Sequence, residues 1–285
     1  MLSANSTQEL EATQPIRIGV VEFLNAAPLI DGLCKLESLQ IVPAVPSSLI
    51  DLLESRQVDI AMCSSIDYQR SKDDLIMLPC GIVGSTGHSM TVRLFSSCAI
   101  DNIRTVACDT HSHTSVVLMQ ILLKRIHGLD VEVTALNIAD ASATWCSGSK
   151  PPYDAMMLIG DKVVNNAPPK EIFPIELDLG QAWHEYTKTS FCFAIWLAHA
   201  DIDLARLQMA AAVLDRQRRL NFHRIEQVLV PRCQSTCWSV QSALEYTTQM
   251  LDYAFTDEHR RGLNLFFDEA YTLGFTDQRR PLVEL

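Results

Sequence analysis

The segment IRIGVVEFLNAAPLIDGL, residues 16–33, carries the pattern that decides the fold. Its first part, IRIGVV at 16–21, is an apolar run typical of a strand that is buried on both faces. A helix is expected to begin near Ala26 to Pro28, because proline fits the first turn of a helix. A buried strand followed at once by a helix is the repeating unit of α/β proteins.

The same order of strand and helix recurs along the chain. Further strand-like runs are QIVPAV (40–45), VDIAMCS (58–64), MTVRLFSS (90–97), RTVACD (104–109), VEVTAL (131–136), AMMLIG (155–160) and FCFAIWLA (191–198). Helical segments lie between most of them, and from Asp201 onward the chain is mostly helical. The sequence therefore predicts an α/β fold with a mostly parallel sheet, in which a second unit of the same kind begins near residue 98.

Composition excludes several classes of protein. Hydrophobic residues make up 48% of the 285 residues, which is enough apolar material for cores and rules out a disordered chain. The net charge is −11, whereas a protein that binds a phosphate backbone carries basic excess, so nucleic acid is not an expected partner.

The N-terminus and the cysteines indicate the compartment. Residues 1–15 are polar, lack the basic and apolar regions of a signal peptide, and are expected to form a flexible tail. There is no apolar stretch of about 18 residues, so no membrane insertion is expected. The nine cysteines are scattered without metal-site spacing and predict free thiols in a reducing compartment. We therefore expect a cytoplasmic protein with no metal site.

The segment DTHSHTSVVL, residues 109–118, is the best candidate for anion binding. Ser112, Thr114 and Ser115 stand where a helix begins after a strand. A carboxylate there would meet free backbone N–H groups and the positive end of the helix, worth roughly 0.3–1 kcal/mol from the dipole. A well-capped helix without a ligand is the alternative.

Other polar residues also follow strands, where ligands bind in open α/β sheets. They are Asn25 after the first strand, Ser64 and Ser65 in CSSIDY, Ser89 and Thr91 in the loop GSTGHSMTVRL (84–94), and Gly160 and Asp161 in LIGDKVV. Each of these segments is open to two interpretations, a ligand contact or an ordinary cap or loop. His88 is a conceivable general base, but a lone loop histidine is more often a bystander.

Motifs for other chemistries are absent from the sequence. It contains no GxxxxGK[ST], GxGxxG, GxSxG or HExxH, and no paired carboxylate motif. Chemistry that depends on a metal or a nucleotide is therefore disfavoured.

Five segments together resemble the chorismate dehydratase family of the futalosine route to menaquinone. They are IRIGVVEFLNAAPLIDGL, VPSSLIDLLESRQVDIAMCSSIDY, SHTSVVLMQILL, AMMLIGDKVV and DLGQAWHEYTKTSFCFAIW, and their order matches from about residue 15 to residue 275. The resemblance implies the two-lobed fold of type 2 periplasmic binding proteins, with the active site in the cleft between the lobes. It also implies that chorismate, a small dicarboxylate, is converted without a cofactor to 3-[(1-carboxyvinyl)oxy]benzoate and water. We expect the first lobe to comprise residues 16–97 and 196–285, and the second lobe residues 98–195.

The resemblance also assigns residues. Asn25 matches the family's cleft asparagine and Thr91 stands where a serine is usual, so these two are expected to be catalytic. Residues expected to bind the substrate are Ser64, Ser65, Ser89, Ser112, Thr114, Ser115, Gly160 and Asp161. A binding protein of the same fold that holds a small carboxylate without turnover, and the related 1,4-dihydroxy-6-naphthoate synthase, are the alternatives.

Three departures from the family pattern stand close to these residues. His113 replaces the arginine of S-R-T-S, Thr91 adds a methyl group, and Lys188, Thr189 and Ser190 replace the glycine, leucine and proline of T-G-L-P-F. They identify the chain as a divergent member.

Overall fold

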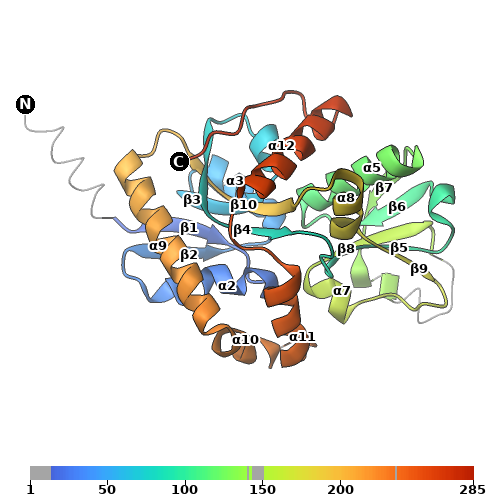
Figure 1. Cartoon of the computed structure of the whole chain (residues 1–285), viewed down its shortest axis with the longest axis horizontal. Helices are drawn as coiled ribbons and strands as arrows, with labels where there is room; N and C mark the ends of the chain where they lie inside the picture. Colours follow the sequence, from blue (N-terminus) through green and yellow to red (C-terminus); the bar gives the residue numbers. More distant parts are fainter. Residues whose placement is uncertain (1–13, 140, 143–150, 235) are drawn as a thin grey trace, which may run out of the picture.

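Two five-stranded sheets lie side by side and give the molecule two lobes (Figure 1). The computed structural model describes residues 14–139, 141–142, 151–234 and 236–285. The first sheet has the order β2-β1-β3-β10-β4, with β1 Ile16–Val20, β2 Leu39–Pro43, β3 Ile60–Ser64, β4 Leu75–Ser85 and β10 Phe191–His199. The second has the order β7-β6-β8-β5-β9, with β5 Val92–Ser96, β6 Thr105–Cys108, β7 Glu132–Ala135, β8 Ala155–Ile159 and β9 Ile175–Asp178. The predicted α/β class is confirmed.

The prediction of a mostly parallel sheet is confirmed, because in each sheet four of the five strands run in one direction and one strand runs against them. In the first sheet β1 pairs in parallel with β2 and β3, whereas β10 is antiparallel to both β3 and β4. In the second sheet β6 pairs in parallel with β7 and β8, and β5 is antiparallel to β8 and β9. Strands β10 and β5 arrive from the opposite lobe rather than from a local helical crossover, so nothing constrains them to run parallel.

The strand pairings divide the chain at other points than the sequence predicts. Strand β5, expected in the first lobe, pairs with β8 and β9 of the second sheet. Strand β10 begins at Phe191, within the segment expected in the second lobe, yet it lies between β3 and β4 of the first sheet. The chain therefore crosses between the sheets in segments 86–91 and 179–190, before each of these strands begins.

Helices cover the sheets and connect them. In chain order they are α2 Ala27–Ile30, α3 Pro46–Glu54, α4 Asp67–Arg70, α5 His113–His127, α7 Asp161–Asn165, α8 Leu179–Thr187, α9 Leu204–His223, α10 Ile225–Cys233, α11 Val240–Glu245 and α12 Asp257–Thr272. Short 3-10 turns occur at η1 Leu24–Ala26, η2 Leu33–Lys35 and η3 Ile100–Asn102, and a π-helical turn, η4, at Tyr246–Met250. The expected helix after the first strand is confirmed.

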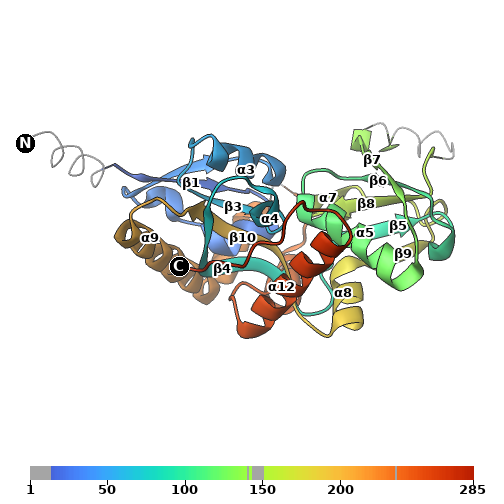
Figure 2. The same cartoon turned by 90° about the horizontal axis from the view of Figure 1, so that it is seen from above.

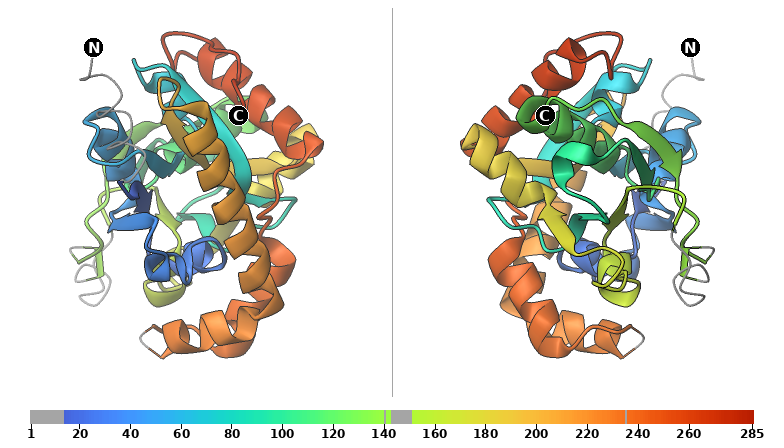
Figure 3. Two further views of the ribbon diagram at one scale, coloured as in Figure 1. Left: turned by 90° about the vertical axis from the view of Figure 1, so that its left-hand side faces the viewer. Right: turned by 90° about the vertical axis from the view of Figure 1, so that its right-hand side faces the viewer.

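The first sheet is covered on opposite sides by α3 and α9 (Figure 2). Helix α3 packs on β1 and β3, and α9 runs across β4, as Figure 3 shows. Helix α12 contacts both β10 and α5, so it bridges the two lobes.

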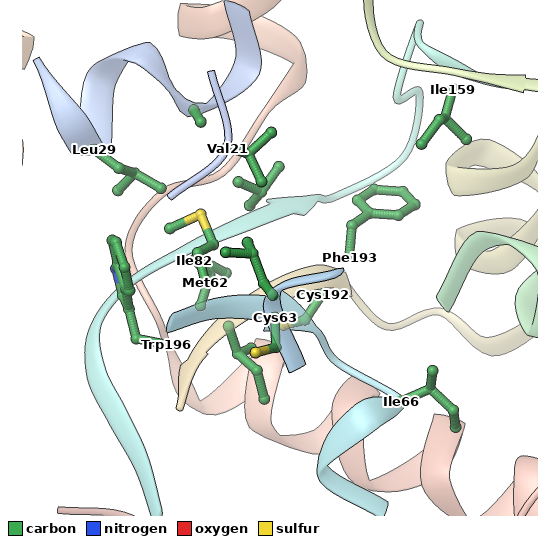
Figure 4. Close-up of a cluster of buried hydrophobic side chains, with 14 of the residues drawn as sticks. Val21, Leu29, Met62, Cys63, Ile66, Ile82, Ile159, Cys192, Phe193 and Trp196 are labelled. Carbon is green, nitrogen blue, oxygen red and sulfur yellow. The ribbon is translucent and has the colours of Figure 1, made fainter. Parts of the chain in front are cut away.

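One apolar cluster runs through both lobes. It includes Ile18 and Trp196 from the first sheet and Val106 from the second. Figure 4 shows part of it, from Trp196 at one end to Phe193 and Ile159 at the other. Because the apolar side chains are continuous, burial of apolar surface favours close approach of the lobes.

Three sequence expectations concern the chain outside the sheets. The expected tail lies outside the described residues except for Gln14 and Pro15. The eight described cysteines are free thiols, as predicted, and Cys146 lies outside the described residues. Within the described ranges, no helix is long and apolar enough to cross a membrane.

Candidate active site

A cavity lies between the lobes, at the carboxyl ends of β1, β3 and β8. Its lining residues come from both sheets and from the C-terminal helices: Val21, Phe23, Asn25, Ala26, Pro46, Met62, Ser64, Val83, Thr91, Val92, Ser112, Ser115, Ile159, Gly160, Phe193, Ala194, Tyr246 and Leu251. The free volume is about 60 Å³, below the roughly 300 Å³ at which pockets for small molecules begin. In this arrangement the cavity is therefore smaller than a ring that carries two carboxylates.

Six of the residues predicted from the sequence line this one cavity. They are Asn25, Ser64, Thr91, Ser112, Ser115 and Gly160. Segments that follow different strands meet here because the carboxyl ends of neighbouring parallel strands lie at one edge of a sheet. Their roles in catalysis and substrate binding remain predictions.

The start of α5 presents hydroxyl groups to the cavity. Ser112 is the N-cap, and its Oγ accepts a hydrogen bond from the backbone N–H of Ser115 at 3.2 Å. The two hydroxyl oxygens lie 2.9 Å apart, and both side chains are buried. Small polar side chains at the positive end of a 15-residue helix suit a carboxylate.

Gly160 brings backbone close to the cavity. Its φ of +56° lies in the left-handed region, where a Cβ is strained, and a Cβ would also stand 3.4 Å from the Phe23 ring. Its N–H donates to the carbonyl of Thr91 at 2.8 Å, which continues the pairing of β5 with β8 up to the cavity.

Ser65 and Thr114 lie in the seam between the lobes rather than in the cavity. Their hydroxyl oxygens are 3.2 Å apart, with Ser65 on the first lobe and Thr114 on the second. Ser65 Oγ donates to the carbonyl of Cys192 at 2.8 Å, and Thr114 Oγ1 accepts from the N–H of Ile66 at 3.1 Å. Both hydroxyls form hydrogen bonds with protein groups, so they can be buried without an unsatisfied donor or acceptor.

Ser89 also lies outside the cavity, in the crossing that leads to Thr91. Its N–H and its hydroxyl both donate to Asp178 Oδ1 at 2.9 Å. Asp178 is the N-cap of α8 and accepts a third bond from the N–H of Met90 at 2.7 Å. This carboxylate holds the crossing in the conformation that delivers Thr91 to the cavity.

Asp161 joins three parts of the chain behind the cavity wall. Its Oδ1 accepts from Trp238 Nε1 at 2.9 Å, and its Oδ2 accepts from the N–H of Leu24 at 3.4 Å. Burial raises the pKa of this carboxyl, and the bonds from Trp238 and Leu24 act against that rise. The bond from Leu24 links Asp161 to the segment that carries Asn25.

Sequence reasoning missed Tyr246, which is buried and lines the cavity. Its hydroxyl lies 2.5 Å from Thr91 Oγ1, and its ring stacks on Trp238 with centroids 5.0 Å apart. Burial raises the pKa of the phenol, and hydrogen bonds with Thr91 and Asn25 act in the opposite direction. In the sequence it is one residue of an ordinary helical stripe, and the π-helical turn that begins with it has no sequence signature.

The described residues that line the cavity include no charged side chain. His88 lies on the crossing, half-exposed, with its Nδ1 3.1 Å from the N–H of Met90. His111 lies outside the cavity too, 3.0 Å from Lys162 Nζ. Among the described residues, no group of three histidine, cysteine or acidic side chains could hold a metal ion.

His113, at the position where the family has arginine, forms an ion pair between the lobes. Its Nδ1 lies 2.8 Å from Oδ1 of the buried Asp67 on α4. The hydrogen bond with Asp67 raises the pKa of His113, while burial acts against that rise. Burial raises the pKa of Asp67 as well, against the lowering effect of His113. Arg70 and Asp51 are the other charged groups that act on this pair.

This pair predicts a stability that depends on pH. Both shifts mean that the folded state binds protons more tightly than the unfolded state, so stability falls as pH rises. For His113 the contribution is complete below the ordinary pKa of 6.5 and is lost as pH rises through the higher folded value. We expect wild type to exceed His113→Gln in melting temperature by more at about pH 6 than at about pH 9.

His127→Gln is the matched control for this measurement. His127 pairs with Asp101 at 2.7 Å, but that aspartate is 79% exposed, and exposed pairs contribute little. The melting temperature of His127→Gln should stay close to that of wild type at both pH values. If the difference in melting temperature between wild type and His113→Gln does not shrink as pH rises, the pair does not contribute to stability as proposed.

Comparison with known proteins places the chain in a family. A family model described as menaquinone biosynthesis matches residues 16–272. The chorismate dehydratase of Thermus thermophilus is 31% identical over 198 residues, which cover 64% of this chain and 69% of that protein.

Solved structures show the fold. An Archaeoglobus fulgidus protein, 12% identical, superimposes with a TM-score of 0.74 over 92% of this chain and 99% of its own. The periplasmic aliphatic sulphonate binding protein of Escherichia coli, 17% identical, gives 0.62 over 95% and 94%. The expected periplasmic-binding-protein-like fold is thus confirmed. Since the family model matches nearly the whole chain, the protein belongs to the menaquinone biosynthesis family.

Proposed function

We propose that the protein is a chorismate dehydratase, a carbon–oxygen lyase that converts chorismate to 3-[(1-carboxyvinyl)oxy]benzoate and water in menaquinone biosynthesis. The observation that carries the proposal is the convergence of Asn25, Thr91 and the hydroxyls of Ser112 and Ser115 on one interlobe cavity, in a chain of this family. The relative from Thermus thermophilus supports the choice of substrate.

The chemical groups that line the cavity suit both ends of this substrate. A carboxylate can accept hydrogen bonds from Ser112 and Ser115 at the N-terminus of α5. The ring can lie against the apolar wall formed by Phe23, Met62 and Phe193. Water is excluded from such a wall, and hydrogen bonds to developing charge are stronger where water is absent.

The reaction removes the ring hydroxyl and a neighbouring ring proton. The electron pair of the broken C–H bond completes the aromatic ring, and the C–O bond breaks with its pair on oxygen. Because the product is aromatic, orientation and neutral hydrogen-bond donors can supply much of the remaining stabilisation. We propose that a carboxylate of the substrate accepts the ring proton, since the described cavity residues include no charged base.

Incubation of the purified protein with chorismate, followed by mass spectrometry, tests the proposal. We expect a product lighter by one water, with an aromatic ultraviolet spectrum, formed faster than in a sample without protein. Thermal stabilisation by chorismate without any product would instead identify a binding protein that does not turn over its ligand.

A further inference from the structure

Tyr246 places a phenolic O–H group in the cavity, and it is not among the residues that the family pattern predicts. Its side chain is 1% exposed, and its hydroxyl contacts Thr91 Oγ1 at 2.5 Å. Asn25 acts on the same phenol from another wall. Both residues that the sequence marks as catalytic therefore converge on this hydroxyl.

The protein holds this phenol firmly. The Tyr246 ring stacks on Trp238 at an interplanar angle of 16°, and Trp238 Nε1 donates to the buried carboxylate of Asp161. Tyr246 also opens the π-helical turn η4, a local irregularity that is frequently found at functional sites. A side chain fixed by stacking and by a hydrogen bond behind it meets the requirement for a preorganised donor.

The proposed dehydration needs such a donor. Hydroxide is a poor leaving group, so the ring oxygen must gain a proton as the C–O bond breaks. No lysine, arginine or histidine is among the described residues that line the cavity. Burial raises the pKa of the phenol, so the Tyr246 hydroxyl carries the proton that it would donate.

We propose that Tyr246 is a further catalytic residue, the general acid that protonates the departing ring hydroxyl. This inference rests on the proposed function. The ring C–H proton passes to the substrate carboxylate, the C–O bond breaks, and the leaving oxygen takes the phenolic proton and departs as water. Thr91 and Asn25 stabilise the phenolate, which then recovers its proton from the substrate's carboxylic acid group.

The test compares Tyr246→Phe with Tyr253→Phe, using the full chain and chorismate. Tyr253 is also buried, and its hydroxyl has no hydrogen-bond partner among the described residues, but it does not line the cavity. We expect Tyr246→Phe to lower kcat by about 10²-fold or more, with KM close to that of wild type, because general acid catalysis contributes on that scale. Tyr253→Phe should keep the wild-type kcat.

The outcomes separate this inference from the function on which it depends. If wild type forms no product, both are overturned. If wild type forms product and a folded Tyr246→Phe keeps its kcat, only the role of Tyr246 is overturned. If that variant fails to fold, the turnover of wild type is measured in D₂O instead. Slower turnover supports transfer of an exchangeable proton, and an unchanged rate overturns the role of Tyr246 as general acid.

Discussion

Asn25→Ala is expected to lower kcat with chorismate by about 10²–10³-fold, which corresponds to roughly 2.7–4 kcal/mol. Asn25 lies in η1, directly after β1, and lines the cavity opposite the start of α5. Its amide also acts on the phenol of Tyr246. Because the described residues of the cavity wall carry no charge, we expect one neutral donor to provide a large share of the stabilisation of the transition state.

Steady-state kinetics of purified protein measure this effect. KM should change less than kcat, because a donor aimed at developing charge acts mainly in the transition state. Asn102→Ala is the control, since Asn102 is an exposed asparagine in η3 and is absent from the cavity. Unchanged kcat in Asn25→Ala would remove Asn25 from the proposed mechanism.

Gly262→Ala is expected to destabilise the protein by about 2 kcal/mol or more, although alanine is the better helix former by about 1 kcal/mol. Gly262 is buried in α12, where a Cβ would overlap the backbone carbonyl oxygen of Ser190 and stand 3.1 Å from Thr189 Oγ1. Both neighbours belong to the segment that leads into β10. Because backbone cannot rotate away as a side chain can, the helix must shift from the sheet.

Thermal unfolding shows this effect as a fall in melting temperature of roughly 3–4 °C or more for a chain of this size. Arg261→Ala provides the control, because Arg261 is the adjacent residue of the same helix and is exposed. That variant should melt within a degree or two of wild type. If Gly262→Ala melts at or above the temperature of wild type, helix α12 can shift without loss of stability, and the prediction is wrong.

The sequence by itself determined the elements and the places where a ligand could lie. Strand β1 follows from the apolar run at 16–21, and α5 follows from its serine cap. Hydrophobic periodicity and capping are local, so they can be recognised without knowing what packs on them. Ligands bind beyond the carboxyl ends of strands, and this rule predicted Asn25, Thr91 and Ser115 as site residues. All three line the same cavity.

Tertiary structure alone decided which sheet each crossing strand joins and which polar side chains face the ligand. The chain reaches β5 and β10 from the opposite lobe, and the residues of these strands do not indicate which strands they will pair with. Thr114 and Ser115 are neighbours, yet one faces the seam and the other the cavity, because successive residues of a helix point about 100° apart. Tyr246 joins the site only because the C-terminal helices return to the interlobe edge, a long-range contact that depends on the packing of the whole chain.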